Sequence, residues 1–297
     1  MTLSDIRSLF KNPTPAELQL IAKYAELEDD PRRARAFEAF AKTGLPHRRM
    51  EQWKWTDFRQ NLPSIEPAAG QSVRTLKAPE GAIIIAFNGQ SWTVPDELPD
   101  GLRVFEKTEA QAFGGAEAMP IAALTASLTG NGPATDLLQF EVTEKVNGPL
   151  FIDFGGAGET ALSRLAFVIR PEASLDLVEM HRSTSGFSSS MLEFGLQERA
   201  SLTRTILQDN GGDAASAVTA TATLAKDASF TQTILAFGSK ISRIETRIAY
   251  DGSDAKAVLN AVYLPRAGRH VDLTSHVRHG APSCVTRQLT KGAISKG

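Results

Sequence analysis

Val218-Thr219-Ala220-Thr221-Ala222-Thr223-Leu224, followed by the turn Ala228-Ser229-Phe230, is the stretch that decides the fold. The threonines of this stretch alternate with small or aliphatic residues. Further along, Arg243, Glu245 and Arg247 alternate in the same way with Ile244, Thr246 and Ile248. Period-two alternation places apolar side chains on one face of a strand and polar side chains on the other. The pattern therefore predicts strands with one buried face.

The turn recurs five times along the chain. Its copies are Ala173-Ser174-Leu175, Ala200-Ser201-Leu202, Ala228-Ser229-Phe230, Ala255-Lys256-Ala257 and Pro282-Ser283-Cys284, at intervals of 27, 28, 27 and 27 residues. Each unit has room for two strands of about seven residues, which matches one coil of a parallel β-helix. A single coil cannot bury its own apolar face, so the coils must stack. Leucine-rich repeats have a similar length, but their Leu and Asn consensus is absent.

Aligning the turns predicts which residues stack inside the solenoid. The first inward residues after the turns are predicted to be Leu175, Leu202, Phe230, Ala257 and Cys284. The last inward residues before the turns are predicted to be Ile169, Leu196, Leu224, Tyr250 and Val277. We expect each set to form one column of side chains, because the alternation keeps its register from coil to coil.

The composition is that of an ordinary globular protein. The chain has 297 residues, of which 42% are hydrophobic and 22% charged, with a net charge of −2. This charge argues against a nucleic-acid partner, because phosphate contacts require a basic surface. One cysteine excludes an internal disulfide and a multi-cysteine zinc site. No apolar run reaches the roughly 20 residues of a membrane span, and the N-terminus lacks the regions of a signal peptide. We therefore expect a cytoplasmic protein without a membrane partner.

Three regions follow from these patterns. Residues 1–62 are predicted to form a helical N-terminal domain, with a capping box at Thr14-Pro15-Ala16-Glu17. Residues 63–136 are predicted to be a linker with a β-hairpin around Asn88-Gly89 and irregular structure. Residues 137–297 are predicted to form the parallel β-helix, which we expect to be incomplete at its C-terminal end because no capping element follows the last repeat.

Cys284 and His279 are the candidate ligand residues of the chain. Cys284 is either a small buried apolar residue or a thiolate that binds iron or relays sulfur, and the residues alone leave both possibilities open. His279 lies near the same turn, but one Cys and one His do not define a metal site. His270, Asp272 and His276 share the outward face of one strand. The two histidines lie about 20 Å apart on an extended strand, so we expect surface or interface residues and no metal site.

Two further motifs have a structural and a functional interpretation. Trp53-Lys54-Trp55 could stack on nucleic-acid bases, but aromatic anchors between a helical and a β domain are favoured. Gly155-Gly156-Ala157-Gly158 resembles a phosphate loop only superficially, because the Gly-Lys-Ser/Thr ending and the following helix are missing. A turn between coils is favoured there.

Two segments resemble one known family, the SufB/SufD family. Its N-terminal motif runs roughly as Pro, a basic residue, Glu and then Trp-Lys-Tyr-Thr, and here the similar segment is Leu45-Pro46-His47-Arg48-Arg49-Met50-Glu51-Gln52-Trp53-Lys54-Trp55-Thr56. The family's His-Ala-Ala-Pro…Ser-x-Gln-Leu-x-Lys-Gly segment is similar to residues 279–292, which begin His279-Gly280-Ala281-Pro282 and end Gln288-Leu289-Thr290-Lys291-Gly292. The helical N-terminus and its motif favour the SufD branch.

The resemblance implies a fold and a function. The fold is mainly β, a right-handed parallel β-helix with coils of about 27 residues after a small helical domain. The function is that of a non-enzymatic scaffold in the SUF iron–sulfur cluster assembly complex. Its partners would be a SufB-like subunit and a SufC-type ATPase, the latter through a C-terminal region absent here. We expect no tightly bound cofactor, and a transient iron–sulfur cluster only in the assembled complex.

The resemblance also marks a difference, because family members continue past the Gln-Leu-x-Lys-Gly segment into further coils and terminal helices. We therefore interpret this chain as C-terminally truncated, and carry no family functional residue over to it. The alternative function is that of a polysaccharide-acting parallel β-helix enzyme. Such enzymes need clustered acidic or basic side chains on one outer face, whereas the polar face here is rich in Thr and mixed in charge.

Overall fold

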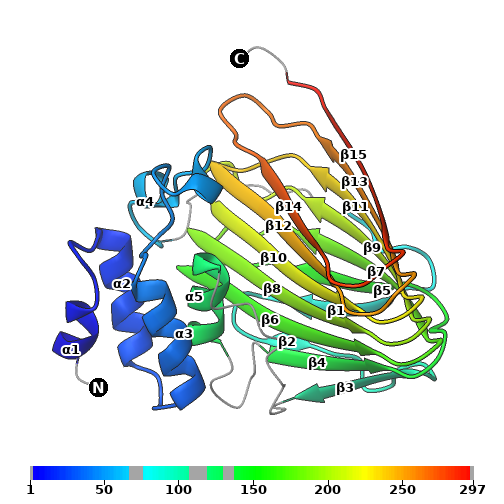
Figure 1. The fold of residues 1–297 in the computed structure, drawn as a ribbon. Helices are drawn as coiled ribbons and strands as arrows, with labels where there is room; N and C mark the ends of the chain where they lie inside the picture. The colour runs from blue at the N-terminus through cyan, green and yellow to red at the C-terminus, as the bar shows by residue number, and fades with distance from the viewer. Residues whose placement is uncertain (1–2, 67–75, 107–118, 130–136, 295–297) are drawn as a thin grey trace.

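The computed structural model describes residues 3–66, 76–106, 119–129 and 137–294, and their main feature is a parallel β-solenoid of about six turns (Figure 1). Two sheets form its walls. Sheet A has the strand order β15-β13-β11-β9-β7-β5-β1-β2, and sheet B has the order β14-β12-β10-β8-β6-β4-β3. Because the chain alternates between the sheets, each pair of successive strands forms one coil. This confirms the predicted fold class.

The strands of sheet A, in chain order, are β1 (Ile83–Phe87), β2 (Trp92–Thr93), β5 (Leu150–Phe154), β7 (Ser174–His181), β9 (Ser201–Gln208), β11 (Ser229–Ala236), β13 (Lys256–Tyr263) and β15 (Val285–Gly292). Those of sheet B are β3 (Leu102–Glu106), β4 (Leu137–Val142), β6 (Thr160–Ile169), β8 (Phe187–Leu196), β10 (Ala215–Leu224), β12 (Ile241–Tyr250) and β14 (Asp272–His279). The predicted hairpin at Asn88-Gly89 is present as the antiparallel pair β1–β2. However, β1 also pairs in parallel with β5, so the hairpin extends sheet A.

A left-handed backbone residue shapes each of the repeated turns. Glu172, Arg199, Asp227, Asp254 and Ser283 have φ between 57° and 65°. The first four donate their backbone N–H to a carbonyl in the turn of the next coil, at 3.0 to 3.2 Å. Left-handed φ is unfavourable for residues with a side chain. Its recurrence at equivalent positions shows that stacking of the turns outweighs this cost.

In the last coil, the strand register differs from the one predicted for both columns. Ala257 pairs with Thr286, not with Cys284, and Tyr250 pairs with His279, not with Val277. The four earlier members of each column are in register as predicted. The error arises because the chain advances nine positions from Tyr263 to Asp272 but only seven between their paired residues, Ala236 and Arg243. The residues that follow are therefore displaced by two positions.

The core is a column of aromatic rings inside the solenoid. Phe140 and Phe167 stack at 4.7 Å between ring centroids, and Phe167 and Phe194 stack at 5.1 Å. All three side chains are buried. In-register pairing of β4, β6 and β8 places the rings one above another. Stacked apolar residues of successive coils thus supply the burial that a single coil lacks.

Helices cover the outer face of sheet B beside β6, β8 and β10 (Figure 1). They are α1 (Leu3–Ser8), α2 (Pro15–Ala25), α3 (Pro31–Ala41), the short 3-10 helix η1 (Glu51–Trp53), α4 (Phe58–Asn61) and α5 (Pro120–Leu128). The predicted capping box begins α2, where Thr14 and Glu17 exchange hydrogen bonds. Helix α5 lies against β8, and the hydroxyls of Thr125 and Ser189 are 2.7 Å apart. None of the helices in the described residues is long and apolar enough to cross a membrane.

Candidate functional site: the polar interior of the solenoid

Charged and polar side chains occupy the interior of the middle coils. Strand β7 points Leu175, Leu177 and Glu179 to the same buried side, because successive residues of a strand alternate between faces. By the same rule β9 points Arg204 inward. The predicted columns contain no charged residue, so the sequence analysis missed this site. The parity of Glu179 with Leu175 and Leu177 was the signal that could have found it.

The inward groups form a continuous hydrogen-bonded chain. The Arg204 guanidinium donates from Nε and Nη2 to the two carboxylate oxygens of Glu179, at 2.6 and 2.9 Å. Its Nη1 donates to Gln232 Oε1 on β11 at 2.8 Å. Gln232 Oε1 also accepts from the Thr246 hydroxyl on β12 at 3.1 Å. This interior chain therefore links three strands of sheet A to sheet B.

Both members of this ion pair are fully buried. Glu179 and Arg204 each have 0% of their surface exposed. Burial by itself raises the pKa of the Glu179 carboxyl. The Arg204 charge and hydrogen bonds from His181 and Arg204 outweigh that effect, and the pKa lies below its usual range. Glu179 is thus held as a carboxylate with its oxygens occupied, which suits a structural ion pair better than a proton-transfer group.

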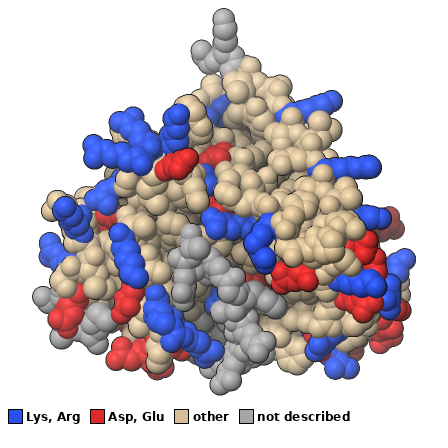
Figure 2. Space-filling view, in the orientation of Figure 1, with Lys and Arg blue, Asp and Glu red and all other residues tan. Residues whose placement is uncertain are grey.

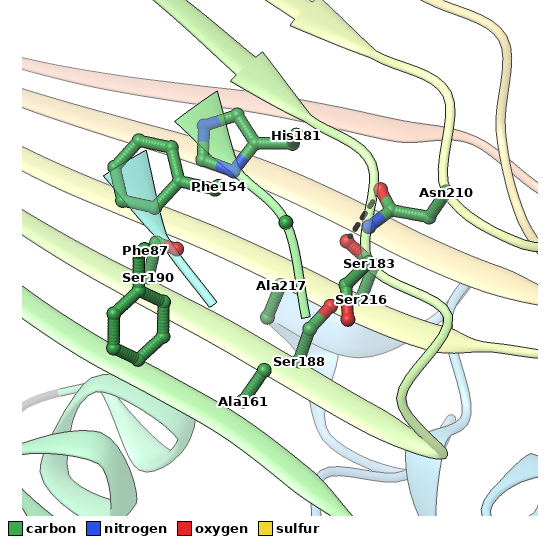
Figure 3. Close-up of a pocket in the computed structure, with 11 residues that line it drawn as sticks. Phe87, Phe154, Ala161, His181, Ser183, Ser188, Ser190, Asn210, Ser216 and Ala217 are labelled. Carbon is green, nitrogen blue, oxygen red and sulfur yellow. Dashed lines mark hydrogen bonds between the residues drawn. The ribbon is translucent and has the colours of Figure 1, made fainter. Parts of the chain in front are cut away.

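His181 connects these hydrogen-bonded side chains to a small cavity (Figure 3). Its Nε2 lies 3.0 Å from Glu179 Oε2, and its ring stacks on Phe154 at 4.3 Å. The cavity is also lined by Ser183, Ser188, Ser190, Asn210 and Ser216, and the volume that a water molecule could occupy there is about 10 Å³. That is space for about one water molecule. The cavity is too small for an iron–sulfur cluster or an organic substrate.

Hydroxyl and amide groups give this edge of the interior its polarity. Asn210 Oδ1 accepts from the Gln208 side-chain amide at 2.7 Å and from the Ser216 hydroxyl at 3.1 Å. Gln208 Oε1 accepts from the backbone N–H of Gly238 at 2.9 Å. Buried polar groups need such partners, because an unpaired one carries a large desolvation cost. The network fixes these side chains and orders the connections between the sheets.

Cys284 lies in a turn at the last coil, equivalent to Ala255 of the preceding coil. The residues at this position in earlier coils are Ala173, Ala200 and Ala228. Cys284 is partly buried against the core. Its Sγ lies 3.3 Å from the Gly252 carbonyl oxygen and 3.5 Å from that of Pro282, so the thiol donates to backbone carbonyls.

His279 lies near the same turn but faces hydroxyl groups. Its Nε2 is 3.2 Å from the Thr286 hydroxyl, which is in turn 2.9 Å from the Tyr250 hydroxyl. Burial raises the pKa of Tyr250, and the nearby Cys284 adds to this effect while Thr286 opposes it. Within the described residues, no group of three or more His, Cys, Asp or Glu side chains is placed to hold a metal ion. A ligand role for Cys284 or His279 therefore stays a prediction.

Residues Gln52–Thr56, which we call the docking segment, attach the helical domain to the solenoid. The Arg243 guanidinium lies over the Trp53 ring at 4.0 Å, a favourable cation–π distance. The buried Thr56 donates its hydroxyl to Asp272, and His270 Nε2 donates to the Trp55 carbonyl oxygen at 3.0 Å. Trp53 is therefore an aromatic anchor between the helices and the solenoid, as predicted, whereas the Trp55 ring is exposed and the prediction is wrong for it. His270 and Asp272 contact the docking segment.

The two remaining motifs have simple placements. His276 is partly exposed, with Nε2 at 3.8 Å from Glu245 Oε1. Residues 155–158 form the turn between β5 and β6, as favoured from the sequence. A Cβ atom at Gly156 would lie 2.7 Å from the Ser183 hydroxyl oxygen, so close packing requires glycine there.

The solenoid is similar in sequence to a domain of known proteins. The sequence model for "SUF system FeS cluster assembly, SufBD core domain" matches residues 152–297, which begin in β5 and include all later coils. Iron-sulfur cluster assembly SufBD family proteins of Mycobacterium bovis and Mycobacterium tuberculosis are each 24% identical to the chain over 256 residues. The aligned residues are 84% of this chain and 59% of each relative.

A shorter similarity points the same way. A SufBD family protein of Mycobacterium leprae is 28% identical over 114 residues, which are 38% of this chain and 29% of that protein. The chain thus spans about 59% of the length of the first two relatives. Together these matches show that the solenoid of this chain is similar to the SufBD core domain of iron–sulfur cluster assembly proteins.

Proposed function

We propose that this chain belongs to the SufBD family and is a non-enzymatic scaffold component in iron–sulfur cluster assembly. The observation that carries the proposal is the match of residues 152–297 to the SufBD core domain. The structure arranges these residues in stacked coils, which give a solenoid an extended surface for partners. Relatives named for iron–sulfur cluster assembly support the same function.

The ion pairs of the solenoid also favour a scaffold over an acid–base enzyme. Asp153 pairs with Arg182, and Glu193 pairs with Arg164, at 2.6 and 2.7 Å between neighbouring coils. Glu245 accepts from Arg247 Nε at 2.8 Å. Acid–base hydrolysis of sugars needs two carboxyl groups facing one substrate, whereas these carboxylates are neutralised by arginine. The first two pairs join neighbouring coils, and the pair of Glu245 with Arg247 lies within β12.

The finer proposal concerns the branch and the partners. The N-terminal motif and the helical domain favour the SufD branch, with a SufB-like subunit and a SufC-type ATPase as partners in the cytoplasm. The docking segment supports this branch, because its Trp-Lys-Trp-Thr residues join the helical domain to the solenoid. A transient cluster would be a property of the assembled complex.

Co-purification tests the proposal. The tagged chain is co-expressed with the SufB-like subunit of the same organism, with and without the SufC-type ATPase, and the eluate is examined by light scattering. We expect a complex of defined mass with the SufB-like subunit, whose iron and sulfide content rises during anaerobic reconstitution. Each protein purified alone is the control. Separate elution of the two chains would contradict the proposed partnership.

A further inference from the structure

The docking segment exposes one large aromatic ring, although the residues before and after that ring contact the solenoid. Arg247 Nη2 donates to Gln52 Oε1 at 3.4 Å, and Arg243 covers Trp53. The carbonyl oxygen of Trp55 accepts from His270, and Thr56 is buried. These contacts involve β12, β14 and the residues just before β14. The position of the Trp55 backbone is therefore set by the solenoid.

The Trp55 ring itself is 78% exposed, more than any other large apolar side chain among the described residues. The contact we find on its face is Lys54, whose Nζ lies 4.8 Å from the ring centroid. An exposed indole on a fixed backbone loses little conformational entropy when it becomes buried. Tryptophan is also enriched among the residues that dominate binding energy at protein interfaces. The ring has the properties of an anchor residue.

Three exposed cations precede this ring in the sequence: Arg48, Arg49 and Lys54. Within the described residues none of their side chains forms an ion pair. The backbone of this segment is fixed independently, since the N–H of Arg48 donates to Asp57 at 3.4 Å and that of Arg49 to His47 at 3.2 Å. Figure 2 shows Lys and Arg side chains gathered over the part of the surface where Figure 1 places α4. Exposed Glu51 and partly exposed Asp57 lie in the same stretch, so the surface around Trp55 is mixed in charge with a positive excess.

We propose that Trp55, with Arg48, Arg49 and Lys54, forms a docking surface for a protein partner that presents an apolar pocket rimmed by carboxylates. Charge complementarity selects the acidic rim, and the indole requires the pocket. A nucleic acid fits the surface less well. One exposed ring and three cations are few for a strand that tracks a continuous basic groove, and the whole chain carries a net charge of −2.

The test rests on the proposed function, because its probe is the purified SufB-like subunit of the same organism. Binding to the full chain is measured by biolayer interferometry for the wild type, Trp55→Ala and the double variant Arg48→Glu/Arg49→Glu. We expect Trp55→Ala to weaken binding roughly 30-fold or more, as for an anchor residue. The double variant should lower the association rate roughly 10-fold at low salt, and this effect should vanish near 0.5 M salt.

Ile84→Ala is the matched control, because Ile84 is another exposed apolar residue, 50% accessible, and lies on β1. Its binding should equal that of the wild type. Thermal unfolding should show unchanged stability for all three variants, since none of the replaced side chains is buried. Wild-type affinity in Trp55→Ala would overturn the docking surface and leave the proposed function intact. Failure of the wild-type chain to bind would overturn both, and tight binding of an oligonucleotide that depends on Trp55 would show that the wrong class of partner was chosen.

Discussion

Two parts of the solenoid interior are built on opposite principles. Around Phe167 the inward positions are aromatic or aliphatic and stack ring on ring. Around Arg204 the inward positions hold an ion pair, amides and hydroxyls, each satisfied by a partner in another strand. The difference shows that in-register stacking tolerates charge in a core, provided that neighbouring coils supply the partner.

The energetics of the two regions differ accordingly. The phenylalanine column gains stability from burial and contact, so the removal of one ring leaves no unpaired charge behind. The ion pair of Glu179 and Arg204 adds little net stability, because the desolvation of both ions offsets their attraction. Its members are instead strongly dependent on each other. Variants that remove one or both members of the ion pair should therefore behave differently from variants that remove one ring of the apolar column.

Removal of one ionic partner should have the largest effect. Arg204→Met leaves the Glu179 carboxylate buried without its counter-charge, and we expect a loss of about 3–5 kcal/mol in the free energy of unfolding. Urea titration followed by circular dichroism measures it. The double variant Glu179→Leu/Arg204→Met should recover most of the loss. If the double variant were as unstable as the sum of both single variants, the two residues would not act as a pair.

Removal of a ring from the apolar column should cost slightly less. Phe167→Ala deletes the central ring between Phe140 and Phe194, and we expect a loss of about 3–4 kcal/mol from lost burial and the resulting cavity. The same urea titration applies. Because no charge is left unpaired, Phe167→Leu should recover most of the stability without a second substitution. A Phe167→Leu variant as unstable as Phe167→Ala would indicate that the stacking geometry matters more than the buried volume.

The pH dependence of stability should have opposite signs in wild type and Arg204→Met. In the wild type the Glu179 pKa is lowered by Arg204 and His181 despite burial, so the stability it contributes is present above its ordinary value of 4.5 and is lost as pH falls below that. In Arg204→Met burial should dominate and raise this pKa. A raised pKa contributes stability at low pH that is lost as pH rises through it. Urea midpoints at pH 7 and pH 5 should therefore be similar for the wild type and higher at pH 5 for the variant. A variant with a flat profile would show that Glu179 keeps another counter-charge.

Replacement of the cysteine should have the smallest effect. Cys284 takes the turn position that earlier coils fill with alanine, so Cys284→Ala should change the free energy of unfolding by less than about 1 kcal/mol. The thermal midpoint measures this change. Iron content after anaerobic reconstitution, wild type beside variant, tests the remaining ligand hypothesis. Loss of bound iron in the variant would assign Cys284 a role beyond packing.

Local patterns were sufficient for the architecture. Period-two alternation and recurring turns predicted stacked coils, because both are properties of a few neighbouring residues. The same reasoning failed at the last coil, where Thr286 and His279 take the inward positions assigned to Cys284 and Val277. The two-residue displacement arises in an irregular connection, and such a connection carries no periodicity from which its length could be derived.

The sequence by itself determined the β-solenoid, its strand faces, the capping box of α2 and the hairpin at Asn88-Gly89. Only the tertiary structure decided which distant side chains meet. Glu179 pairs with Arg204, which lies 25 residues away in the sequence, and Thr56 forms a hydrogen bond with Asp272, which lies 216 residues away. Whether a charge in a strand is buried depends on its partner in another coil, because burial is favourable only when that partner is present. That dependence is a property of the stacked coils and not of any single stretch of sequence.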